Sequence, residues 1–291
     1  MKRILITGAN SYIGVSFENY IKTFYPERYS VDTLDMEKED WREHSFSGYD
    51  SVYHVAGIAH SDSGKISKEK EQLYRRINTD LTFETAKKAK AEGVGQFIFM
   101  SSIIVYGDSA PIGRMKRITG DTVPNPSNCY GDSKLQAELK LAELDSETFR
   151  VCILRCPMIY GKDGKGNFRA LEKYAGKMSL FPKVKNARSM LYIGNLVEFV
   201  RLMVENEERG LYFPQNREYS NTSELVRMIA KAKGRQVRLV PRFGWALKLM
   251  GLFTGTVRKA FGSLVYDSSL SEYKNEYRKY SLEESIKETE S

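Results

Sequence analysis

A tyrosine and a lysine four residues apart, Tyr130 and Lys134, are the pair in this sequence best suited to acid-base chemistry. A helix is predicted to begin after residues 124–127, capped by Ser127 or Asn128, and residues four apart on a helix share one face. Because a cation beside a phenol favours the phenolate, we expect the pKa of Tyr130 to fall from about 10 toward the working pH. The tyrosine could then act as a general base on a sugar or alcohol hydroxyl.

A glycine-bearing turn near the start of the chain is the second chemical feature. Residues 4–6 are an apolar run typical of a strand, and apolar residues at helical spacing follow from Ile13 to Phe24. Such a turn leaves the first N–H groups of the helix free to hold a pyrophosphate, and glycine lets the backbone come close. The residues predicted to hold a dinucleotide in this turn are Gly8, Asn10, Ser11, Tyr12, Ile13 and Gly14.

Two later stretches extend the predicted cofactor site. Asp35 closes a second strand predicted over 31–35, and its carboxylate can accept hydrogen bonds from the ribose hydroxyls of adenosine. The same charge would repel the extra phosphate of NADP, so NAD is the predicted cofactor, although Lys38 lies nearby. Ala56 and Gly57 follow a third predicted strand and would allow a close backbone approach to the cofactor.

The elements that must position these residues alternate between strand and helix. A long helix is predicted over 69–92, and a strand over 97–100 delivers Ser102 to its carboxyl end, where open α/β sheets bind ligands. The helix over 130–144 then leads into a strand over 151–154. This alternation predicts an α/β fold with a Rossmann-type, doubly wound parallel sheet that has helices on both faces.

Beyond Gly161 the regular alternation fades, which indicates a second, smaller unit. We expect residues 1–162 to form an NAD-binding domain, to which 188–206 returns. Residues 163–187 and 207–291 are expected to form a smaller C-terminal lobe that binds the substrate. The segment 108–128, which carries three prolines, is predicted to be a loop that borders the substrate.

Composition narrows the classes of partner. Lys and Arg number 45 against 37 Asp and Glu, a net charge of +8, which we interpret as surface charge with local sites for anionic small molecules. No basic stripe is interleaved with stacking aromatic residues, so a nucleic-acid partner is not expected. No apolar run is long enough to span a membrane, and 243–253 is expected to pack within the smaller lobe, with a membrane-surface helix as the alternative.

Cysteine and histidine usage indicates a reducing compartment and no metal site. The cysteines, Cys129, Cys152 and Cys156, have neither an even count nor a framework spacing, and the three histidines are scattered. The N-terminus leaves no room for a signal peptide before the first predicted strand. A cytoplasmic location is therefore expected.

Together these features resemble the extended short-chain dehydrogenase/reductase family, in its NAD-dependent epimerase/dehydratase branch of the UDP-glucose 4-epimerase type. The resemblance covers about residues 2 to 206, with a looser match to the end, and rests on the order and spacing of several motifs. These are Thr7-Gly8-x5-Gly14, Asp35, Ala56-Gly57, Asn78, Ser102, Tyr130-x3-Lys134 and Leu154-Arg155-x3-Tyr160-Gly161.

The resemblance implies a role for each matching residue. Tyr130 would be the catalytic base, Lys134 would bind the nicotinamide ribose and lower the Tyr130 pKa, and Ser102 would hydrogen-bond the reacting hydroxyl. Asn78 would be the structural asparagine of the long helix, and Pro157 would contact the cofactor. In the smaller lobe, the implied contacts to the UDP moiety are Asn167 and Arg188 at the diphosphate and Phe181 at the uracil. Family members often form homodimers through two helices, here 69–92 and 129–144.

The sequence departs from the family pattern at two places that bind ligands, one for the cofactor and one for the substrate. Ser11 replaces the middle glycine of the nucleotide turn, which suggests a slightly different turn. The family's late Arg-x-x-Asp pair is not evident near Tyr266-Asp267, so the substrate could be held differently, and a lipid-linked sugar stays open.

The residues after Ser102 decide among the reactions of this branch. Dehydration and decarboxylation need acid-base residues directly after the serine, and Ile103 and Ile104 cannot transfer protons. The expected function is an NAD-dependent 4-epimerase of UDP-hexoses or UDP-N-acetylhexosamines for cell-surface polysaccharide synthesis. The alternatives are a 4-keto-reductase of a UDP-2-acetamido-2,6-dideoxy-4-ketohexose and a non-catalytic NAD-binding protein.

Overall fold

The computed structural model describes residues 1–59, 67–164, 166, 168–241 and 261–291. The predictions for Asn167 and for the segment 243–253 lie outside these residues. Among the helices that the structure describes, none has the length and the apolar character needed to cross a lipid bilayer.

A six-stranded, wholly parallel sheet forms the centre of the molecule, in the order β10-β6-β4-β3-β1-β2. Its strands are β1 (Lys2–Thr7), β2 (Tyr29–Leu34), β3 (Ser51–His54), β4 (Gln96–Ser102), β6 (Arg150–Cys156) and β10 (Gly210–Tyr212). Strand β1 lies between β2 and β3. The chain therefore passes from β1 to β2 at one edge of the sheet and then crosses back to form β3 on the other side of β1. The crevice between the carboxyl ends of β1 and β3 is therefore the switch point where such sheets bind ligands.

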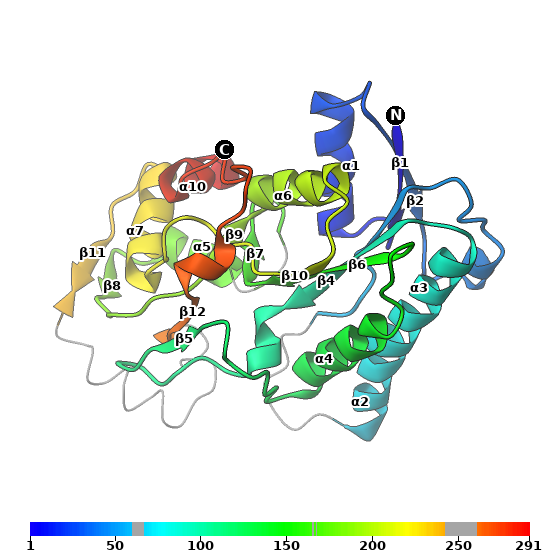
Figure 1. Ribbon diagram of the computed structural model, residues 1–291. Coiled ribbons are helices and arrows are strands. Elements are labelled where there is room, and N and C mark those ends of the chain that lie inside the picture. The colour runs from blue at the N-terminus through cyan, green and yellow to red at the C-terminus, as the bar shows by residue number, and fades with distance from the viewer. Residues whose placement is uncertain (60–66, 165, 167, 242–260) are drawn as a thin grey trace.

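Helices cover both faces of the sheet, which confirms the predicted doubly wound architecture (Figure 1). Helices α1 (Tyr12–Phe24) and α6 (Ile193–Glu205) pack on one face, and α2 (Lys68–Tyr74), α3 (Thr82–Ala91) and α4 (Cys129–Ala142) lie on the other. Strand β4 shows why both faces are apolar: Ile98 joins the core under α1 and α6, whereas Phe97 and Phe99 join the core under α3 and α4. Alternate residues of a strand point to opposite faces, so a doubly covered strand is apolar throughout.

Smaller elements complete the molecule beside the sheet. Helices α5 (Phe168–Lys177), α7 (Thr222–Ala232) and α10 (Leu282–Glu290) form a second core with the paired strands β8 (Leu180–Pro182) and β11 (Arg238–Val240). Two further parallel pairs join β7 (Met158–Tyr160) to β9 (Met190–Tyr192) and β5 (Lys116–Ile118) to β12 (Leu264–Tyr266). The short 3₁₀ helices are η1 (Glu39–Arg42), η3 (Ile103–Tyr106) and η5 (Ser268–Ser271).

The structure differs from the sequence prediction in three elements. The helix expected over 69–92 is divided by a π-helical segment, η2 (Arg75–Leu81), between α2 and α3. The segment 108–128 contains strand β5 and is not wholly a loop. Strand β10 pairs with β6 in the main sheet, although we placed 207–291 in the smaller lobe. The apolar run from Leu211 to Phe213 predicts a short strand here, but the partner of that strand, as in the pairing of Leu211 with Ile153, is non-local and cannot be read from the local sequence.

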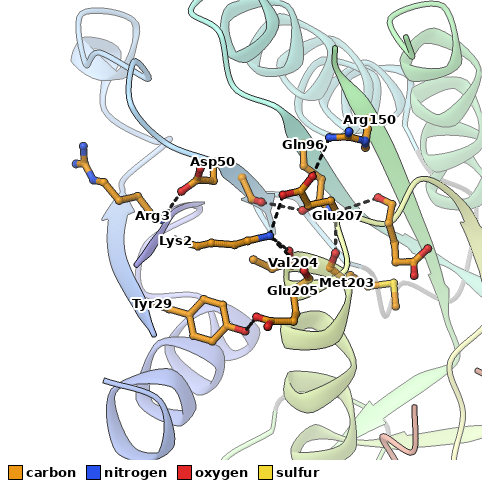
Figure 2. Close-up of polar contacts among 12 residues, drawn as sticks. Lys2, Arg3, Tyr29, Asp50, Gln96, Arg150, Met203, Val204, Glu205 and Glu207 are labelled. Atoms are coloured by element: carbon orange, nitrogen blue, oxygen red, sulfur yellow. Dashed lines mark hydrogen bonds and ion pairs between the residues drawn. The ribbon is translucent and has the colours of Figure 1, made fainter. Parts of the chain in front are cut away.

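The C-terminal end of α6 is attached to the amino ends of the strands (Figure 2). Lys2 Nζ donates to the carbonyl oxygens of Val204 at 3.0 Å and Glu205 at 3.2 Å, and it pairs with Glu207 at 3.0 Å. Arg150 of β6 also pairs with Glu207, at 3.1 Å. The last carbonyl groups of a helix lack partners within the helix and carry partial negative charge, so a lysine there satisfies both needs.

Gln96, at the start of β4, makes the buried part of this attachment (Figure 2). Its Nε2 donates to the carbonyl oxygens of Met203 and Glu208, each at 2.9 Å, and its Oε1 accepts from Ser51 Oγ at 2.7 Å. The side chain is 1% exposed, so the amide makes its hydrogen bonds to the protein rather than to water.

We expect Gln96→Met to lower the free energy of unfolding by about 2–4 kcal/mol, because the Glu208 carbonyl loses its donor and the buried Ser51 hydroxyl loses its acceptor, whereas the Met203 carbonyl keeps its hydrogen bond from Glu208 N. Urea unfolding measures the change. Gln136→Met, at an exposed position on α4, is the matched control and should stay within about 0.5 kcal/mol of the wild type. Equal effects of the two substitutions would contradict the structural role of Gln96.

Candidate active site

A cavity of about 880 Å³ opens at the switch point of the sheet. Residues of the turn after β1 and of the loop after β3 form much of its wall, and this size is ordinary for a cofactor site. Of the residues that the sequence predicts for cofactor binding, those lining the cavity are Gly8, Asn10, Ser11, Asp35, Ala56 and Gly57.

The turn after β1 lies in close contact with the loop after β3. Gly8 has a φ of 114°, and a Cβ there would lie 2.7 Å from Ala56 N. Ser11 caps α1 by accepting a hydrogen bond from Gly14 N at 3.1 Å. A Cβ on Gly14 would lie only 2.7 Å from that serine oxygen, so the cap needs glycine at position 14. Ser11 therefore fits the position of the family's middle glycine by serving as the helix cap.

The walls of the cavity carry charges of both signs. Asp35 directly follows β2, and its Oδ1 accepts from Glu37 N at 3.0 Å, which holds the carboxylate within the turn. Lys38 and Arg42 also line the cavity, and Arg42 donates to the carboxylate of Glu84 at 2.5 and 2.8 Å. The glycine cradle, the amino end of α1 and a carboxylate at the end of β2 fit a dinucleotide with free ribose hydroxyls.

Six predicted cofactor residues lie away from this lining, and two of them, Tyr130 and Lys134, are described below. Tyr12 points to the other side of the turn, where a Cβ on Gly161 would lie 2.5 Å from its hydroxyl, and burial raises the pKa of its phenol. Ile13 packs against the core under α1, Gly14 is buried, and Pro157 is buried between β6 and β7. Their contacts with a cofactor stay predictions.

Several residues of the cavity wall are not among those predicted from the sequence. Trp41 of η1 and Arg76 and Asp80 of η2 line it beside Arg42. The spacing of Arg76, Asp80 and Glu84 is a signal that could have indicated the two residues of η2, since residues four apart on a helix face the same way, but it does not indicate Trp41.

Tyr130 meets Ser102 because α4 begins very close to η3. Asn128 caps α4, as predicted, by accepting a hydrogen bond from Gly131 N at 2.9 Å. A Cβ on Gly131 would lie 2.7 Å from the carbonyl oxygen of Ile104, so this glycine allows the two segments to touch. Strand β4 ends at Ser102, and the serine hydroxyl lies near enough to the Tyr130 phenol to lower the pKa of that phenol by hydrogen bonding.

Lys134 lies one helical turn further along α4 and is 6% exposed. Its Nζ donates to the carbonyl oxygen of Met100 at 2.8 Å and lies 4.6 Å from the ring centre of Phe99. A Cβ on Gly57 would lie 3.3 Å from the same nitrogen, so the ammonium reaches the cofactor side of the sheet edge. Burial lowers the pKa of Lys134 to about 8, against the opposing charge of Glu138.

The acidity of Tyr130 differs from the sequence prediction. Its side chain keeps some accessible surface, yet its dense surroundings raise the pKa of the phenol by burial, and the hydrogen bond with Ser102 lowers it in part. The predicted fall of this pKa toward the working pH is therefore wrong for this structure. Desolvation outweighs the neighbouring cation, whose ammonium is directed to the Met100 carbonyl.

Asn78 connects three segments around this group. It is fully buried in the π-helical segment, where its Oδ1 accepts from Ile58 N at 2.9 Å. Its Nδ2 donates to Ile58 O at 3.1 Å and to Ser133 Oγ at 3.0 Å. π-Helical turns are frequent at functional sites, and this one carries an amide whose hydrogen-bonding groups are all used.

A buried ion pair anchors the middle of α4 to the sheet. Arg155 of β6 donates to Glu138 through Nε at 3.1 Å and through Nη2 at 2.6 Å. Ser101 of β4 donates to the same carboxylate, and Arg155 Nη1 donates to the Tyr106 hydroxyl at 2.6 Å. Glu138 lies on the helix face of Tyr130 and Lys134, at successive spacings of four.

Two of the residues predicted to bind UDP, Phe181 and Arg188, are described by the structure. Arg188 is held through its backbone, which exchanges two 2.9 Å hydrogen bonds with Ser220, and burial lowers the pKa of its guanidinium. Phe181 is 3% exposed and packs against Tyr174 and Phe261. Their contacts with a nucleotide stay predictions, and so does that of Asn167, which lies outside the described residues.

Comparison with known proteins gives a matching family and relatives that align over most of both chains. A model of the NAD dependent epimerase/dehydratase family matches residues 4–213. A UDP-glucose 4-epimerase from Vibrio cholerae is 29% identical over 92% of this chain and 88% of its own length. An N-acetyl-α-D-glucosaminyl-diphospho-ditrans,octacis-undecaprenol 4-epimerase from Escherichia coli O157:H7 is 28% identical over 80% of this chain and 73% of its own.

Solved structures share the fold. A dTDP-4-dehydrorhamnose reductase from Clostridium acetobutylicum superposes with a TM-score of 0.74 at 18% identity, over 99% of this chain and 98% of that one. At this level of identity the likeness concerns the fold.

We expect the burial of Lys134 to make the free energy of unfolding depend on pH. Its pKa is about 8 in the folded chain against an ordinary 10.5, so the unfolded chain binds more protons between these values and the free energy of unfolding rises with pH. Relative to Lys134→Met, the wild type should gain up to about 3 kcal/mol across this interval. Urea unfolding of both proteins at successive pH values measures the difference, and a flat difference would contradict the shifted pKa.

Proposed function

This chain belongs to the NAD dependent epimerase/dehydratase family, and from that premise we propose that it is a 4-epimerase of UDP-hexoses or UDP-N-acetylhexosamines. The observation that carries the proposal is the contact of Ser102 with the Tyr130 phenol, with Lys134 one turn away beside Gly57 of the cofactor cavity. This set can hold a sugar hydroxyl and remove its proton next to a nicotinamide cofactor.

NAD, when bound, supplies the acceptor for the hydride that leaves C4 of the sugar. The residues suited to hold it are the backbone of the turn from Gly8 to Ser11, which would face its phosphates, and Asp35, which would accept from its adenosine ribose. Lys134, next to Gly57, is placed to reach the nicotinamide ribose.

The chain's own residues would handle the proton at O4. Ser102 would hydrogen-bond and orient the sugar hydroxyl, and Tyr130 as phenolate would take its proton while the C4 hydrogen leaves. After the 4-keto sugar rotates, the Tyr130 phenol returns the proton to the oxygen as hydrogen returns to the other face of C4. Because burial raises the pKa of Tyr130, the positive charge of Lys134 is needed to favour the phenolate.

Elimination of water is not supported. Ile103 and Ile104 open η3 directly after Ser102, and their hydrocarbon side chains neither donate nor accept protons. Apolar residues at positions 103 and 104 do not prevent Ser102 and Tyr130 from transferring the proton at O4, because epimerisation needs no second acid-base pair.

The relatives support a glycosyl diphosphate as substrate. The Vibrio cholerae relative is named for UDP-glucose and aligns over most of both chains, which favours a UDP-sugar. The Escherichia coli relative is named for an undecaprenol-linked N-acetylglucosamine, which makes a lipid-linked sugar diphosphate the second candidate. A role in polysaccharide synthesis, the cytoplasmic location and the homodimer stay predictions.

Incubation of the purified protein with NAD and no added reductant tests the reaction. We expect interconversion at C4 of UDP-galactose and UDP-glucose or of their N-acetylamino counterparts, followed by NMR of the sugar. Conversion of undecaprenyl diphospho-N-acetylglucosamine alone would favour the second candidate. Turnover only with a 4-keto sugar and stoichiometric NADH would overturn the epimerase and indicate a reductase.

We expect Tyr130→Phe to lower kcat by about 10²- to 10⁴-fold, because the phenol is the proposed proton acceptor. NAD binding, measured by fluorescence titration, should change little. Tyr174→Phe removes a hydroxyl from a 43% exposed side chain on α5 and is the control expected to keep wild-type kcat. Comparable kcat for the two variants would rule out Tyr130 as the base.

A further inference from the structure

We propose that His54 and Thr82 are positioning residues for this reaction, which hold the π-helical segment and the start of α4 in register with the nucleotide turn. They would act through Asn78 and Ser133 on Tyr130. The inference rests on the proposed function for its kinetic test, and its structural test is independent of any substrate.

His54 lies at the end of β3, fully buried, with a threonine at each ring nitrogen. Its Nδ1 is 2.8 Å from Thr7 Oγ1 of β1, and its Nε2 is 3.0 Å from Thr82 Oγ1 at the start of α3. Phe97 and Phe99 stack against the ring, with centroids 5.5 and 6.3 Å away. The imidazole therefore connects the last residue of the first strand to the helix that follows the π-helical segment.

The hydrogen bonds assign the tautomer of His54. Thr82 Oγ1 donates its only proton to the carbonyl oxygen of Asn78 at 2.9 Å, so it must accept from a proton on His54 Nε2. Nδ1 then carries no proton and accepts from Thr7 Oγ1. Burial keeps the ring neutral by lowering its pKa to about 3, and the nearby charge of Lys134 acts in the same direction.

The chain of hydrogen bonds continues to the proposed base. Asn78 Nδ2 donates to Ser133 Oγ at 3.0 Å, and Ser133 Oγ donates to the carbonyl oxygen of Tyr130 at 2.9 Å. Thr79, in the same π-helical segment, donates to the carbonyl oxygen of Ser133 at 2.7 Å. The series thus runs from β1 to the first turn of α4 and passes through Asn78, whose backbone carbonyl accepts from Thr82 and whose side-chain amide donates to Ser133.

This series has a geometric purpose because the π-helical segment departs from ordinary helix geometry. A π-helical turn needs outside support, and Thr82 ties its last part to the sheet while Asn78 ties its middle to α4. Loss of the His54 contact should let Asn78 shift, and Tyr130 would move relative to Ser102. A small misplacement of a reacting group lowers kcat more than it changes binding.

The variants Thr82→Val and Thr85→Val form a matched pair. Both threonines are fully buried on α3, and both donate to the carbonyl four residues back, Thr85 to Leu81 at 2.7 Å, but only Thr82 also contacts His54. We expect Thr82→Val to lower kcat about tenfold with an unchanged KM, and Thr85→Val to keep kcat within about twofold. Equal kcat values for the two variants would overturn the proposal.

Hydrogen–deuterium exchange tests the same point without substrate. Thr82→Val should speed exchange at least severalfold in both 75–82 and 129–134, whereas Thr85→Val should leave 129–134 unchanged. Exchange that changes only next to the substituted residue overturns the positioning series. If the exchange pattern is as expected and no sugar turns over in any protein, the proposed function fails and the positioning series stands.

Two substitutions of His54 distinguish the contributions of its two ring nitrogens. His54→Gln can place an amide N–H near Nε2 and keep the bond to Thr82, while His54→Asn can place an amide oxygen near Nδ1 and keep the bond from Thr7. We expect His54→Gln to retain several times more kcat than His54→Asn. Equal losses would indicate that His54 acts only as part of the core.

Discussion

The buried ion pair between Glu138 and Arg155 is the interaction on which the active-site region depends. It joins α4 to β6, and the hydrogen bond from Ser101 joins the same carboxylate to β4, so one helix is attached to two adjacent strands at their carboxyl ends. Removing one partner of such a pair costs about 3–5 kcal/mol because a buried charge is left uncompensated. The helix that carries Tyr130 and Lys134 is thereby held against the strand that ends in Ser102.

Close backbone contacts at glycine residues, together with this ion pair, position the reactive side chains. Gly131 lets the first turn of α4 touch η3, and Gly57 leaves room for the Lys134 ammonium beside Asn78. Gly8 does the same where the nucleotide turn meets the loop after β3. Side chains larger than glycine would separate these segments. The sheet edge therefore combines a nucleotide cradle, a cation and a phenol within one rigid arrangement, in which binding and proton transfer share their supports.

The local patterns of the sequence predicted much of this arrangement. The apolar runs and the helical periodicities predicted the parallel sheet and its two helical layers, and the Tyr130 to Lys134 spacing with Asn128 as cap predicted their common face. These signals are readable because each depends on neighbours within a few residues. The place of β10 in the main sheet and the cavity wall at Trp41 depend on partners far along the chain, and the helical pattern of 69–92 did not predict the π-helical segment within it.

The sequence by itself determined the fold class, the nucleotide turn and which residue types are available for proton transfer, because these follow from side-chain chemistry and from periodicity along the chain. Only the tertiary structure decided the electrostatics of the site. Burial lowers the pKa of Lys134 and raises that of Tyr130, contrary to the expectation for an exposed helical pair. Desolvation depends on how densely distant segments pack around a group, which spacing along one helix cannot express.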